Sequence, residues 1–99
     1  MGFFNSMSTI NKINRLLKDL ENQVTISQDL VQRDAPIYNL QNSLNVHKQI
    51  HQELINLFSQ SGGARMSIFT IFGDKMNMDG ILTYSKNLCY NLEAIIRNK

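Results

Sequence analysis

The sequence predicts an all-α fold, an antiparallel helical bundle of three long helices plus one short apolar helix. Three observations predict it. Apolar residues recur at spacings of three and four over long stretches. The one proline, Pro36, interrupts the first of these stretches, because proline lacks the amide that a helix interior needs. Gly62 and Gly63 end the second, since glycine suits a helix C-cap. Short connections make successive helices antiparallel neighbours, so residues 1–99 are expected to form a single helical-bundle domain.

Composition narrows the classes of function. The chain has 99 residues, of which 42% are hydrophobic and 18% charged, with a net charge of +2. Such a balance is typical of one globular domain with a modest core. Because like charges form no block, nothing favours a nucleic acid or an anionic membrane as partner. No apolar run approaches the ~18 residues that a membrane span needs, and the single cysteine, Cys89, excludes an internal disulfide. We therefore expect a cytoplasmic protein with no membrane span.

The first long helix is predicted over residues 6–33, with Ser6 or Ser8 as its N-cap. Its apolar positions alternate at spacings of three and four, which is the seam of a coiled coil, interrupted by a serine. The seam consists of Ile10, Ile13, Leu17, Leu20, Val24, Ser27 and Val31. This helix is expected to pack lengthwise against the one that follows Pro36.

The second long helix, residues 37–60, carries two apolar lines. The broader arc contains Ile37, Leu40, Leu44, Leu54, Ile55 and Phe58, with His47 and His51 inside it. A narrower line runs along Val46, Ile50 and Leu57 on another side. A helix with two apolar lines and few charges needs neighbours on two sides, so this segment is predicted to be the central helix.

The stretch from Met66 to Phe72 carries no charge and is apolar at five of its positions, Met66, Ile68, Phe69, Ile71 and Phe72. Its length suits a short helix or a strand. A lone strand has no evident partner in this sequence, so we expect a short helix that acts as an apolar plug. Residues 74–80 are interpreted as a polar connector, and the last helix is expected to begin at an Asp79 cap and run to Arg97.

His47 and His51 form the one constellation with possible metal chemistry. Their i, i+4 spacing places both imidazoles on one helical face, as zinc ligands require. Further ligands would come from Cys89, Glu53 or Asp residues, and no second pair at this spacing exists. Lys48 follows His47, so the His-Glu-x-x-His pattern of zinc proteases is absent. The alternative is that both rings pack neutral in the helix seam.

We therefore predict a non-enzymatic interaction protein that self-associates, as a homodimer, or docks on a protein partner through apolar helix surface. The expected partner-binding residues are Val46, Ile50, Leu57, Met66, Phe69 and Phe72. An alternative is a metal- or small-ligand-binding bundle that holds zinc through His47 and His51. A further alternative is a cytosolic bundle like the immunity proteins of bacteriocin producers, an analogy of fold and length alone. Phosphate-cradling glycine loops and paired catalytic carboxylates are absent, so no enzyme is predicted.

Overall fold

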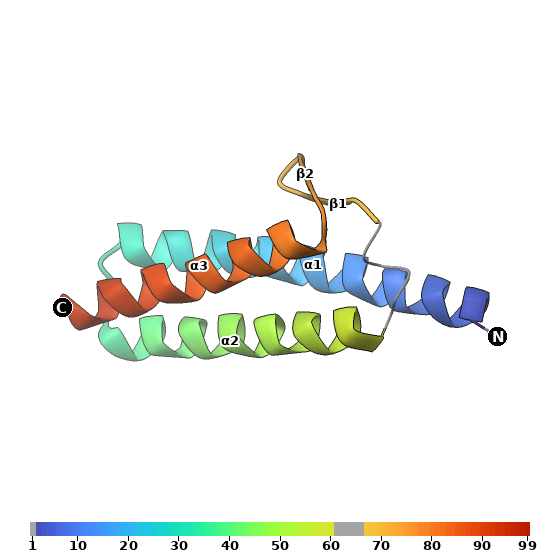
Figure 1. The fold of residues 1–99 in the computed structure, drawn as a ribbon. Coiled ribbons are helices and arrows are strands. Elements are labelled where there is room, and N and C mark those ends of the chain that lie inside the picture. Colours follow the sequence, from blue (N-terminus) through green and yellow to red (C-terminus); the bar gives the residue numbers. More distant parts are fainter. Residues whose placement is uncertain (1, 61–66) are drawn as a thin grey trace.

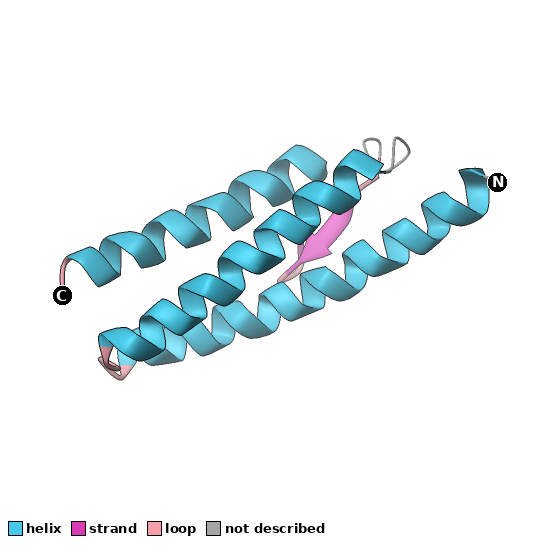
Figure 2. Ribbon diagram, turned by 90° about the horizontal axis from the view of Figure 1, so that it is seen from below, coloured by secondary structure: helices cyan, strands magenta, loops and turns pink. Residues whose placement is uncertain are grey.

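The computed structural model describes residues 2–60 and 67–99, with side chains from Ser8 onward. Three helices and a small hairpin make up this part of the chain (Figure 1). The elements in order are α1 (Gly2–Gln32), α2 (Ile37–Gln60), β1 (Phe69–Ile71), β2 (Asp74–Met76) and α3 (Met78–Arg97). The long helices lie side by side, which gives an elongated molecule of 49 × 23 × 17 Å (Figure 2). The predicted helical bundle and the mostly helical character are thus confirmed, although a two-stranded sheet accompanies the helices.

A tight turn makes α1 and α2 antiparallel. The amide of Ala35 donates to the carbonyl of Leu30 at 2.9 Å, so the chain reverses directly after α1. Asp34 takes a left-handed conformation with φ of 53°, as residues just beyond a helix C-terminus often do. Pro36 precedes the first turn of α2, where its missing amide costs nothing. At the other end of the chain, Lys99 binds the Asp34 carboxylate and so ties the end of α3 to this turn.

Helix α2 packs against both other helices, as expected of the central helix, whereas α1 and α3 approach each other closely at few points. The larger core cluster joins α1, α2, the β-hairpin and the start of α3, and a smaller one joins α2 to α3 through Leu40, Leu44, Cys89 and Leu92. The larger cluster contains Ile13, Leu16, Leu17, Leu20, Val24, Ile50, Leu54, Phe58, Phe69, Ile71 and Ile81. The α1 seam therefore faces the core, and Ser27 is buried with it.

The short apolar helix predicted for residues 66–72 is wrong. Met66 lies outside the described residues, and Phe69–Ile71 form strand β1, which pairs antiparallel with β2 in the register Phe69↔Met76. The partner strand is the segment that had been interpreted as a polar connector. Both turn residues, Phe72 and Gly73, have positive φ (50° and 82°), the conformation of a type I′ hairpin turn.

Two predicted helix starts are also wrong. Helix α1 begins at Gly2 and not at a cap formed by Ser6 or Ser8. Helix α3 is capped by Asn77, whose Oδ1 accepts from the Gly80 amide at 2.9 Å. Asp79 lies instead in the first turn of α3, where a carboxylate still interacts favourably with the helix dipole.

Three residues that were assigned to the buried arcs, Val31, Ile37 and Ile55, are in fact exposed. Val31 and Ile37 flank the α1–α2 turn, at the end of the helical hairpin that α1 and α2 form. A periodic apolar pattern gives the direction of the buried face, but it does not give the point along the helix where coverage ends.

Phe69 and Phe72 are expected to respond differently to truncation. Phe69 is 2% exposed and its ring lies 5.7 Å from that of Phe58, whereas Phe72 is half exposed at the turn. Phe69→Ala should lower the free energy of unfolding by about 3 kcal/mol or more, through lost burial and a cavity. Phe72→Asn should change it by less than about 1 kcal/mol, because Asn tolerates positive φ. Urea denaturation of both variants measures the difference, and equal losses would contradict the hairpin packing.

Candidate functional site

The main surface feature is a groove along the face of the α1–α2 hairpin. Three hollows, of about 320, 340 and 290 Å³, follow one another along it and share lining residues. The first and second share Leu16, Asp19 and Glu53, and the second and third share Gln23 and Val46. We call this feature the α1–α2 groove. Its α1 wall contains Lys12, Arg15, Leu16, Asp19, Asn22, Gln23, Ile26 and Leu30, and its α2 wall contains Asn39, Asn42, Ser43, Val46, Gln49, Ile50, Glu53, Asn56 and Leu57.

Three of the predicted partner-binding residues, Val46, Ile50 and Leu57, lie together on the α2 wall of this groove. Ile50 is buried at its floor, Leu57 is half-buried, and Val46 is 40% exposed. Opposite them, Ile26 on the α1 wall is 51% exposed. The groove therefore presents partly exposed apolar side chains from both helices.

Sequence reasoning missed the α1 wall, including Ile26. A second line does run along α1 at spacings of four and three, through Lys12, Leu16, Asp19, Gln23, Ile26 and Leu30. Half of the residues in this line are charged or carry an amide, so a search for apolar periodicity does not detect it. The same spacing read without regard to polarity finds it.

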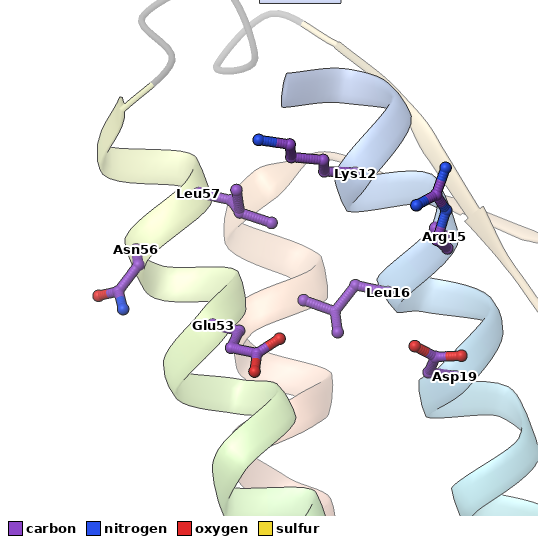
Figure 3. Close-up of a pocket in the computed structure, with 7 residues that line it drawn as sticks. All are labelled: Lys12, Arg15, Leu16, Asp19, Glu53, Asn56 and Leu57. Atoms are coloured by element: carbon purple, nitrogen blue, oxygen red, sulfur yellow. The ribbon is translucent and has the colours of Figure 1, made fainter. Parts of the chain in front are cut away.

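The end of the groove near the α1 N-terminus carries charges of both signs (Figure 3). Leu16 and Leu57 point into the space between the helices, and the carboxylates of Asp19 and Glu53 face this space from opposite walls (Figure 3). Lys12 and Arg15 lie on α1, further toward its N-terminus. In the part of the chain that the structure describes, these four residues form no ion pair with one another. The remaining groove residues, from Asn22 and Gln49 to the α1–α2 turn, are uncharged.

Hydrogen bonds between buried or half-buried side chains join α2 to its neighbours. Ser27 Oγ on α1 lies 3.2 Å from His47 Nε2, and both side chains are buried. Gln23 Nε2 donates to Ser43 Oγ at 2.6 Å, also across α1 and α2. His51 Nδ1 lies 3.0 Å from the buried Ser85 Oγ on α3.

The two histidines, predicted as metal ligands, thus each hold a serine from a different helix. Among residues 8–60 and 67–99, no group of three or more His, Cys, Asp or Glu side chains is placed to hold one metal ion. Structural zinc is usually held by four protein ligands. Cys89, a proposed further ligand, is buried in the α2–α3 core, and this burial raises the pKa of its thiol. Zinc binding by His47 and His51 therefore stays a prediction.

Burial disfavours the charged form of both imidazoles. It lowers the pKa of His47, whose ring is 1% exposed and whose Nδ1 has no hydrogen-bond partner among the described residues. Burial also lowers the pKa of His51, and the positive charge of Lys86 lowers it further. Protonating the buried His47 would place a cation in the core, and neither ring forms an ion pair with a carboxylate among the described residues.

Stability should consequently fall in acid. The unfolded histidine binds a proton near pH 6.5 and the folded one only at lower pH, so stability is full above 6.5 and declines below it. The decline contributed by His47 should reach at most about 1.4 kcal/mol per pH unit, until the folded ring titrates. Urea denaturation of the parent and of His47→Gln, at pH 7.5 and 5.5, measures it. The Gln variant should lose part of the pH dependence; an unchanged slope would show that His47 is solvated.

The other predicted partner-binding residues do not share a surface. Phe69 is in the core, Phe72 is exposed at the hairpin turn, and Met66 lies outside the described residues. The amide of Phe72 donates to Glu21 Oε2 at 2.6 Å, which fastens the turn to α1. Phe72 and the exposed Ile68 are therefore separate from the α1–α2 groove.

Comparisons with protein-family models, with curated proteins and with solved structures give no match for this chain. Within the described residues, none of the helices is both long and apolar enough to cross a membrane. The functional argument therefore depends on the geometry of the α1–α2 groove and of the buried histidines.

Proposed function

We propose that this protein is a non-enzymatic interaction protein that binds a helix, from another protein or from a second copy of itself, in the α1–α2 groove. One observation carries the proposal. The groove is continuous along the hairpin, and apolar side chains from both walls, Ile26 and Val46 above all, remain partly exposed in it. Exposed apolar side chains that gather in one place often mark a protein-binding surface.

The shape of the groove suits a helix. Two antiparallel helices whose facing positions repeat at spacings of three and four offer ridges and holes to the side chains of a third helix. Burying the apolar walls gives about 25 cal/mol for each Å² removed from water. The amide side chains at the rim, such as Asn22 and Gln49, carry no charge that docking would have to desolvate.

The buried polar groups support a non-enzymatic role. His47 and His51 are held by serines inside the bundle, and the raised pKa of Cys89 keeps its thiol protonated and poorly nucleophilic. The alternatives of a zinc site and of an immunity-like bundle rest on histidine spacing and on fold analogy. A helix-binding groove requires neither, and a cytoplasmic location remains part of the proposal.

Site-specific photo-crosslinking tests the groove in cells that express the protein naturally. With p-benzoylphenylalanine in place of Val46, we expect a discrete protein adduct. With the same residue in place of Gln41, which is exposed on α2 and hydrogen-bonds Asn45 outside the groove, the adduct should be absent. Because both positions lie on one helix, the comparison isolates the groove from general contact with that helix.

A second substitution checks that the adduct depends on both walls. Ile26→Glu should remove it, since the charge would be desolvated by any docked helix. Thr25→Glu, at the adjacent exposed position, is the matched control and should leave it in place. Equal adducts from positions 46 and 41, or none from either, would refute the proposed function.

A further inference from the structure

We propose, resting on the proposed function, that the helix in the groove is α1 of a second copy of this chain. The two α1 helices pack antiparallel about a two-fold axis close to Leu16. Each copy then fills the groove of the other, and the assembly closes as a dimer, the commonest closed symmetry.

With this two-fold axis, the positive charges at one end of each groove face the negative charges of the other copy. Along the groove, the bases Lys12 and Arg15 lie on the N-terminal side of Leu16, and the acid Asp19 lies on its C-terminal side. Rotation about an axis at Leu16 exchanges the two sides, so the bases of each copy face the acids of the other. Glu53, on the opposite wall near Leu16, adds to the acidic side. Facing opposite charges favours such pairing and disfavours a parallel one, in which like charges meet.

The length of α1 supplies the rest of the cover. Its N-terminal turns extend past the end of α2 and have no helix alongside them (Figure 1). With the axis at Leu16, a residue n positions before Leu16 in one copy lies opposite the residue n positions after Leu16 in the other. Residues 2–8 therefore lie level with residues 24–30 of the second copy. That level contains Ile26 and, across the groove, Val46, the most exposed apolar residues of its walls.

Charge reversal tests the pairing in purified protein. Sedimentation equilibrium should show that the parent dimerises at tens of micromolar. The variants Lys12→Glu/Arg15→Glu and Asp19→Lys/Glu53→Lys should each raise the dimer dissociation constant at least tenfold, because like charges then face each other. All four side chains are exposed, so the changes should not disturb folding. An equimolar mixture of the two variants should form a heterodimer, since their charges are again complementary.

Lys18→Glu/Lys75→Glu is the matched control. It changes the net charge by the same amount as Lys12→Glu/Arg15→Glu, but at exposed positions outside the groove. Its dimer dissociation constant should stay within about threefold of that of the parent. Crosslinking from position 46 tests the register: the adduct should join the tryptic peptide that ends at Lys12 of the second copy. A parent that stays monomeric to 500 µM, or a variant mixture that does not associate, would overturn the dimer.

The same measurements separate this inference from the proposed function. If purified parent is monomeric while position 46 still captures a different protein in cells, the second copy is wrong and the helix-binding groove stands. If position 46 captures nothing and the parent is monomeric, both are wrong.

Discussion

The hydrogen bond between Ser27 and His47 determines how α1 lies against α2. An apolar seam with a repeat of three and four residues packs almost equally well when one helix slides by a heptad. A buried imidazole that needs a partner does not allow this freedom, because a shift leaves His47 Nε2 unsatisfied at a cost of about 1–3 kcal/mol. Ser27 keeps its own bond to the Val24 carbonyl in either register. The bond between Gln23 and Ser43 acts in the same way beside it. The tight α1–α2 turn and these polar contacts together set the register of the helical hairpin, and with it the positions of the groove residues.

The open face of the hairpin is a consequence of where the remaining elements go. Helix α3 attaches to α2 through the smaller core cluster and to the α1–α2 turn through Lys99. The β-hairpin is attached to α1 through Glu21. All these attachments lie away from the face that holds Ile26 and Val46. A third helix and a hairpin that both cover one side leave the outer side of the α1–α2 pair as the groove.

Most of the fold could be predicted from the sequence because long helices repeat their signal over many turns. The α2 wall of the groove could also be predicted, since Val46, Ile50 and Leu57 depart from the main apolar arc and demand a second neighbour. The β-hairpin could not. Its turn uses Phe72 at a positive φ where Asn or Gly is usual, and its second strand, Asp74–Met76, shows no apolar alternation. That strand is held by backbone pairing to β1, which leaves no trace in side-chain periodicity.

The interhelical histidine also links the groove to the protonation state of the core. The walls of the groove belong to α1 and α2, and the contact that positions one wall on the other is a neutral imidazole in a site where burial lowers its pKa. A protonated His47 can no longer accept a hydrogen bond at Nε2, although it can still donate one. The cost of acid therefore comes mainly from desolvating the charge and not from losing the serine. Water that entered between α1 and α2 would relieve this cost, but it would also separate the two helices that form the groove walls. The groove and the fold therefore both depend on a neutral His47.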